Sequence, residues 1–109
     1  RYLKKKTIME WTSCQYPEND NRRGLGFDRP IFENSPELSI LDSYPSPSAS
    51  QKSWGHTGFT GTMFWVDPEE DLIFIFLSNR VYPDRAIDSM GKLSTRTRCQ
   101  EAAYIKEII

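Results

Sequence analysis

Residues 55–77 read GHTGFTGTMFWVDPEEDLIFIFL, and this stretch decides the fold. Two apolar runs, 63–66 and 72–77, flank an acidic turn at 67–71 that contains a proline. Short apolar runs bounded by turn residues indicate β-strands, so the stretch predicts an antiparallel hairpin. Before the hairpin lies a glycine-punctuated segment that contains His56, the only histidine of the chain.

Outside the hairpin, the sequence predicts two helices and one more strand. Helical spacing of apolar residues predicts a short helix over 7–15 and a longer one over 95–109, the second with Cys99, Ala102, Ile105 and Ile109 on one face. Residues 23–28 alternate small and apolar side chains, which predicts a strand with close backbone approach that ends at Pro30. Residues 33–53 hold three prolines and seven serines and predict a long surface loop.

The predicted fold class is α+β, an antiparallel sheet with flanking helices. The strand at 72–77 contains no polar residue, so both of its faces should be covered. Two helices, one of them short, cannot cover both faces of a sheet. The sheet therefore looks incomplete on its own, and because the chain also lacks an initiator methionine, we expect a piece of a longer protein.

Composition excludes several classes of function. A length of 109 residues suits one domain, and a net charge of -1 gives no electrostatic case for binding nucleic acid or an anionic membrane. No apolar run approaches the ~20 residues of a membrane span. Cys14 and Cys99 are far apart and only one histidine is present, which disfavours a zinc site. We expect no metal, no cofactor and two buried free thiols, with a long-range disulfide in an oxidising compartment as the alternative.

Taken alone, His56 has three interpretations: a general acid or base, a metal ligand, or a hydrogen-bonded residue near a strand edge. The neighbouring glycines favour chemistry. Gly58 lets a substrate approach the Thr57 hydroxyl, and the backbone amide of Phe59 could then donate to a carbonyl oxygen as an oxyanion donor. The same glycines also fit a bulge or a tight bend.

Other candidate motifs are weaker. The acidic turn at 67–71 lacks the spacing of a calcium-binding loop and suits a hairpin turn. Arg22 and Arg23 look like a solvated pair. Ser89-Met90-Gly91-Lys92 matches the pattern Ser-x-x-Lys, but it follows the hairpin, and Gly91 weakens the helix that would have to carry both groups.

The segments together resemble the C-terminal part of the penicillin-recognising serine hydrolases. These are the serine β-lactamases, the D-Ala-D-Ala carboxypeptidases and the family VIII esterases. The resemblance rests on Arg23-Gly24-Leu25-Gly26-Phe27, on the His-Thr-Gly of residues 56–58, on Val66-Asp67-Pro68-Glu69 and on residues 72–80, which end in Leu-Ser-Asn-Arg. Residues 1–109 would then be the C-terminal part of a single β-lactamase-like domain.

The resemblance implies roles for the third active-site box of that family, which is Lys-Thr-Gly or His-Thr-Gly. His56 would hold positive charge or relay a proton, and Thr57 would bind or orient the substrate. Gly58 and Thr60 would line the substrate, and the Phe59 amide would be an oxyanion donor. Histidine loses its charge near neutral pH more readily than lysine, which favours an esterase or peptidase over an efficient β-lactamase.

The nucleophile of such a site is missing. In the family, Ser-x-x-Lys and Tyr-x-Asn or Ser-x-Asn precede the third box, and neither pattern occurs before His56. We therefore expect a segment that is inactive alone and needs the N-terminal remainder of the same protein to act on a small acyl substrate. The resemblance implies a periplasmic or cell-envelope location. A ligand-binding module without the chemistry is the alternative, and a structural remnant without a site is the third hypothesis.

Overall fold

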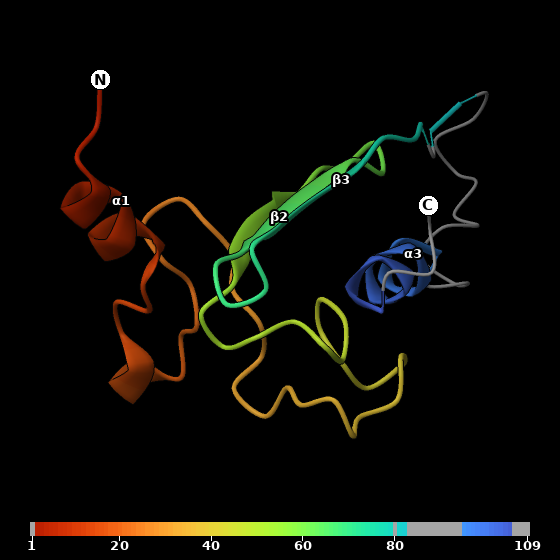
Figure 1. Ribbon diagram of the computed structural model, residues 1–109, viewed down its shortest axis with the longest axis horizontal. Helices are drawn as coiled ribbons and strands as arrows, with labels where there is room; N and C mark the ends of the chain where they lie inside the picture. Colours follow the sequence, from red (N-terminus) through yellow and green to blue (C-terminus); the bar gives the residue numbers. More distant parts are fainter. Residues whose placement is uncertain (1, 80, 83–94, 106–109) are drawn as a thin grey trace.

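The computed structural model describes residues 2–79, 81–82 and 95–105 (Figure 1). Its elements are the helix α1 (Lys5–Thr12), the 3-10 helix η1 (Pro17–Asn19), the strands β1 (Trp54–Thr57), β2 (Met63–Asp67) and β3 (Leu72–Phe76), and the helix α3 (Thr95–Tyr104). The strands form one antiparallel sheet in the order β1-β2-β3. The predicted α+β class is therefore confirmed. No helix of the described residues is long and apolar enough to cross a membrane.

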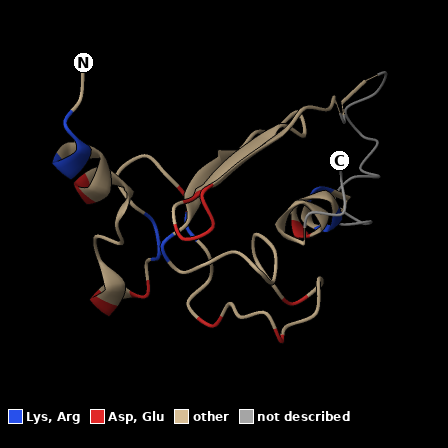
Figure 2. Ribbon diagram, in the orientation of Figure 1, with Lys and Arg blue, Asp and Glu red and all other residues tan. Residues whose placement is uncertain are grey.

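The predicted hairpin is β2 and β3, which pair from Met63 with Phe76 to Asp67 with Leu72. The acidic turn lies at one end of the hairpin, as the red loop of Figure 2 shows. Asp71 closes this turn in the left-handed region at a φ of 51°, a conformation that aspartate tolerates better than most residues. Strand bounds differ from the predicted ones by one residue.

The described residues cover only one face of the sheet. Pairing places His56, Phe64 and Ile75 opposite one another, so their side chains share one face, with Ile73 and Leu77 two positions along. Ile73, Ile75 and Leu77 are 69%, 63% and 80% exposed. We call this face, defined by Phe64, Ile73, Ile75 and Leu77, the open face. Within the described residues, the expectation that both faces of the strand are covered is wrong.

The other face carries the core. Trp65 and Met63 point away from the open face and are 1% and 5% exposed. Beneath them runs the segment 44–53, in which Pro45, Ser46, Ala49 and Ser53 are buried. The Tyr44 ring packs edge-on against Trp65, with centroids 5.8 Å apart.

The loop at 33–53 thus differs from its prediction. It contains no helix or strand, but it is not a surface excursion throughout. The buried side-chain amide of Asn34 donates to the carbonyl oxygens of Ser46 and Ala49 and fixes the fold of the loop. The buried Ser53 hydroxyl donates to the Ser50 carbonyl at 2.6 Å, whereas the buried Ser46 hydroxyl has no hydrogen-bond partner among the described residues.

The C-terminal helix packs through polar contacts. Its described part ends at Tyr104, and Ile109 lies outside the described residues. Ile105 is 56% exposed and the most buried side chain is Gln100, so the predicted apolar face is wrong. Glu101 accepts bonds from the Ser48 amide at 3.0 Å and hydroxyl at 2.5 Å, and the Tyr104 hydroxyl donates to Asp67 at 2.5 Å.

Near the N-terminus, the helix begins and ends earlier than predicted, at 5–12 in place of 7–15. Ser13 ends it in an extended conformation, and the Gln15 side chain folds back to the Glu10 carbonyl. The predicted strand 23–28 is a bend that touches β1 through a single bridge, between Asp28 and Gly55. Gly26, at a φ of 85°, breaks the strand geometry. The predicted close approach is confirmed, because a Cβ on Gly24 would lie 2.6 Å from the Trp11 carbonyl.

Both cysteines are free, as expected, but they are half-buried where buried thiols were expected. The Cys14 thiol donates to the Asn21 carbonyl at 3.3 Å. No disulfide therefore contributes to the fold of the described residues.

Candidate functional site

The glycine-punctuated segment forms the end of β1 and the tight connection to β2. Gly58 donates to the Thr62 carbonyl at 2.8 Å, and Gly61 donates to the Gly58 carbonyl at 3.0 Å. A side chain at Gly58 would overlap the Thr62 hydroxyl. The turn itself thus fills the space beside Gly58. The predicted role of Gly58 in admitting a substrate stays a prediction.

His56 lies at the end of β1 on the open face, and both ring nitrogens make hydrogen bonds. Nε2 is 3.3 Å from Nη2 of Arg23, and Nδ1 is 2.7 Å from the Thr57 carbonyl oxygen. A guanidinium only donates and a carbonyl oxygen only accepts. These two partners suit the tautomer that donates through Nδ1 and accepts at Nε2.

Thr57 follows His56 on the strand, so its side chain points to the opposite face. Tyr44 also lies on that side of the sheet, packed against Trp65, and its hydroxyl donates to Oδ2 of Asp28 at 2.7 Å. The structure therefore does not aim the His56 and Thr57 side chains at the same point, although both border the same hollow. Their catalytic and substrate-binding roles stay predictions.

Asp28 contacts the side chains of two arginines beneath the site. Its buried carboxylate accepts from Nε of Arg22 at 3.2 Å, and Nη1 of Arg23 lies 3.9 Å away. Arg22 also donates to the Arg29 carbonyl at 2.8 Å and stacks 4.9 Å above the Tyr44 ring. The expectation of a solvated arginine pair is therefore wrong for Arg22, whereas Arg23 is exposed. The sequence feature that could have predicted this cluster is the aspartate that follows shortly after the two arginines.

A hollow of about 380 Å³ opens beside His56. Its lining combines the polar end of the β1–β2 connection with apolar strand side chains: His56, Thr57, Gly58, Thr62, Met63, Phe64, Ile75 and Leu77. Phe59 and Thr60 lie in the connection and are exposed, Phe59 to 62%. The hollow is thus wide enough for a small acyl group and continues onto the open face.

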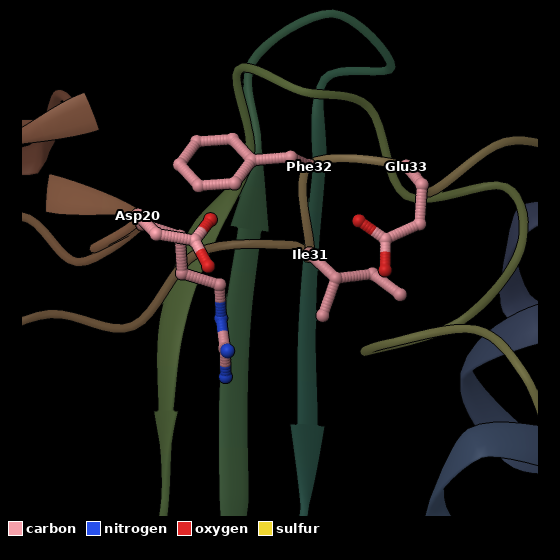
Figure 3. A pocket seen from close by; sticks show the side chains of 5 residues that line it. Asp20, Ile31, Phe32 and Glu33 are labelled. Carbon is pink, nitrogen blue, oxygen red and sulfur yellow. The ribbon is translucent and has the colours of Figure 1, made fainter. Parts of the chain in front are cut away.

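A smaller hollow of about 170 Å³ shares no residue with the first one. Figure 3 shows the carboxylates of Asp20 and Glu33 on opposite sides of it, with the Phe32 ring at its rim. Arg22 also lines it, but its guanidinium is bound to Asp28. None of the residues predicted to form the site lies here.

The sequence motif Ser89-Met90-Gly91-Lys92 lies outside the described residues. Among the residues that the structure describes, no group of three or more histidine, cysteine or acidic side chains is arranged to hold a metal ion. Among the residues that border the His56 hollow, the polar side chains are able to donate and accept hydrogen bonds.

Ionisation of the Tyr44 phenol should make the free energy of unfolding depend on pH. Burial, strengthened by the bond to Asp28, raises the pKa of Tyr44 from 10.0 to about 12. A raised pKa of a phenol means that its contribution to stability is complete below about pH 10 and is lost as the pH rises towards 12. We expect the free-energy difference of unfolding between the wild type and Tyr44→Phe to shrink over this range. Urea unfolding at intervals from about pH 8 to 12 measures it, and a constant or growing difference would contradict the assignment.

A family model described as Beta-lactamase matches residues 5–96 of the chain. The match covers α1, the arginine cluster and the whole sheet. A comparison with curated proteins finds no match, and a comparison with solved structures finds none either.

Proposed function

Because the chain belongs to the β-lactamase family, we propose that residues 1–109 form the C-terminal part of one serine hydrolase domain. The domain acts by acyl-enzyme chemistry on an ester, an amide or a β-lactam. One observation carries the proposal above all: the His-Thr-Gly segment ends strand β1 beside a hollow of about 380 Å³ that is lined by His56, Gly58 and apolar strand side chains.

In this proposal the chain supplies the wall that orients the substrate. His56 borders the hollow, and the amide of Phe59, in the connection that follows, is the oxyanion donor. The serine and its lysine base come from an upstream part, because no Ser-x-x-Lys precedes His56. Groups of an acyl-transfer site act as a unit, so a wall without the nucleophile does not turn over substrate. The chain alone is then inactive.

The exposed apolar side chains of the open face support the proposal that an upstream part of the protein packs there. Contiguous exposed apolar side chains are uncommon on monomeric proteins and mark surfaces that another part covers. His56 shares this face with Phe64 and Ile75. An upstream part that packs against the open face would therefore also bring its groups next to His56 and the hollow.

Hydrolysis by the complete protein tests the proposal. We expect it to hydrolyse a chromogenic cephalosporin or short-chain nitrophenyl esters, and His56→Ala to lower kcat/KM by at least about tenfold (~1.4 kcal/mol). The isolated chain should react at the buffer rate. Lys52→Ala is the matched control, because its side chain is 75% exposed and its ion pair with Glu69 lies at the surface.

Four outcomes would contradict the proposal or one of its parts. Enzymatic turnover by the isolated chain would remove the need for an upstream nucleophile. A complete protein that lacks Ser-x-x-Lys and Tyr-x-Asn or Ser-x-Asn could not carry out the chemistry. A complete protein that binds these compounds without hydrolysing them would favour a ligand-binding module. A loss below about tenfold in His56→Ala would deny His56 a catalytic role.

A further inference from the structure

The connection between β1 and β2 is held by hydrogen bonds from within and from outside. Within it, the Gly58 amide donates to the Thr62 carbonyl at 2.8 Å, and the Gly61 amide donates to the Gly58 carbonyl at 3.0 Å. From outside, the Ser78 hydroxyl donates to the Gly61 carbonyl at 2.9 Å, and Nη1 of Arg96 donates to the Thr62 carbonyl at 3.1 Å. Two consecutive carbonyls of the connection are thus bound by residues that lie 17 and 34 positions further along the chain.

We infer that Ser78 and Arg96 are positioning residues of the site, because they fix the backbone of the β1–β2 connection and, through it, one wall of the hollow. Neither residue is among those that line the hollow, whereas Gly58 and Thr62 are. Both donors bind backbone carbonyls, so they act on the shape of the wall. This inference rests on the proposed function, in which the wall orients an acyl substrate.

The backbone of the connection explains why it needs donors from outside. Gly61 has a φ of 102°, a conformation that glycine adopts readily, but glycine also loses the most conformational freedom when its backbone is fixed. Ser78 and Arg96 are half-buried, so water competes less for the carbonyls that they bind. The bond from Arg96 is also charge-assisted, which makes it the stronger of the two.

Helix α3 is bonded to both ends of β2, and only its first turn reaches the site. Arg96 binds Thr62, directly before β2, and the Tyr104 hydroxyl binds the Asp67 side chain, at the end of β2. Gln100 lies midway between Arg96 and Tyr104, on the same face of the helix, and is fully buried. Loss of the Tyr104 bond would therefore loosen the helix alone, whereas loss of the Arg96 bond would loosen the helix and the wall.

The first test is hydrogen exchange of the complete protein, measured by mass spectrometry with fragmentation to single amides. We expect Arg96→Ala and Ser78→Ala each to raise the exchange rates of the Gly58 and Gly61 amides at least about fivefold, because the connection opens more often. Amides of β2 and β3 should change less than about twofold. Exchange that rises equally over the whole sheet, or that does not rise at the two glycines, would overturn the inference.

The second test measures hydrolysis of 4-nitrophenyl butyrate and of a chromogenic cephalosporin by the complete protein. A small misplacement of an orienting group lowers the rate of the chemical step, so Arg96→Ala should lower kcat at least about tenfold and change KM less than about threefold. Arg96→Lys should restore part of kcat, because lysine also donates to a carbonyl. Ser78→Ala should lower kcat by a smaller factor, about threefold, because a neutral bond is lost.

Two matched controls separate positioning of the wall from docking of the helix. Tyr104→Phe removes the bond at the far end of α3, and Arg98→Ala removes an exposed arginine of the same helix. We expect both to keep kcat within about twofold of the wild type.

Three kinetic results would overturn the inference. They are an unchanged kcat in Arg96→Ala, a loss that Tyr104→Phe equals, and a rise in KM alone, which marks lost uniform binding. If the wild type hydrolyses neither compound, the proposed function fails, and hydrogen exchange still decides whether Ser78 and Arg96 hold the connection.

Discussion

Gly55→Ala should destabilise the chain by about 3 kcal/mol or more, a large part of the roughly 5–15 kcal/mol that holds a domain folded. Gly55 lies in the middle of β1, and a Cβ there would overlap the Phe64 carbonyl oxygen and come within 2.8 Å of the Trp65 ring. Gly55 cannot move away easily, because it exchanges bonds of 2.7 and 3.0 Å with Asp28 on its other side. Urea unfolding followed by tryptophan fluorescence measures the loss.

Gly26→Ala is the matched control for this substitution. Nothing lies within 4 Å of a Cβ at Gly26, but its φ of 85° is unfavourable for alanine. We expect a cost of about 1 kcal/mol from the backbone conformation alone. If Gly55→Ala costs no more than Gly26→Ala, the close packing of β1 on β2 is not what requires glycine.

Asp67→Ala is expected to cost about 3 kcal/mol or more. The Asp67 side chain is 1% exposed and accepts four hydrogen bonds: from the Ser50 amide and hydroxyl at 2.9 and 2.6 Å, the Glu69 amide at 3.1 Å and the Tyr104 hydroxyl at 2.5 Å. Alanine leaves these donors without their acceptor, and buried unpaired donors are costly. Chemical denaturation of the variant measures the change.

Tyr104→Phe tests how much one bond to Asp67 contributes compared with the whole set of bonds to this carboxylate. It removes one donor to Asp67 and keeps the ring, so we expect a loss of about 1–2 kcal/mol. In the wild type, the Tyr104 phenol should also resist ionisation, because burial and the bond to Asp67 raise the pKa of Tyr104. Equal losses in Asp67→Ala and Tyr104→Phe would mean that the carboxylate joins only α3 to the sheet and that its bonds to Ser50 and Glu69 contribute nothing.

The hairpin could be predicted because its determinants are local. The two apolar runs at 63–66 and 72–77 and the turn residues between them lie next to one another in the sequence. The role of Asp67 could not be predicted in this way. In the sequence it is one of several acids of a turn, and its burial results from contacts with Ser50 and Tyr104, which lie 17 and 37 residues away.

The His56 region likewise combines a local motif, which could be predicted, with a long-range contact, which could not. The His-Thr-Gly segment is recognisable as a motif, and the structure places it beside a hollow. Arg23 is 33 residues from His56, and only folding brings them together. The predicted strand at 23–28 was wrong for a related reason: an alternating pattern does not report the positive φ of Gly26.

An uncovered β3 is a template for cross-β stacking. Its sequence, from Leu72 to Leu77, is a six-residue apolar segment without charge or proline, which is the composition of steric zippers. β3 is also an edge strand of the described sheet, and the side chains of Ile73, Ile75 and Leu77 face solvent. Asp71 is the charged gatekeeper at its start. A part of the protein that packed against the open face would therefore also shield an aggregation-prone segment, and assembly of the site would be linked to solubility of the protein.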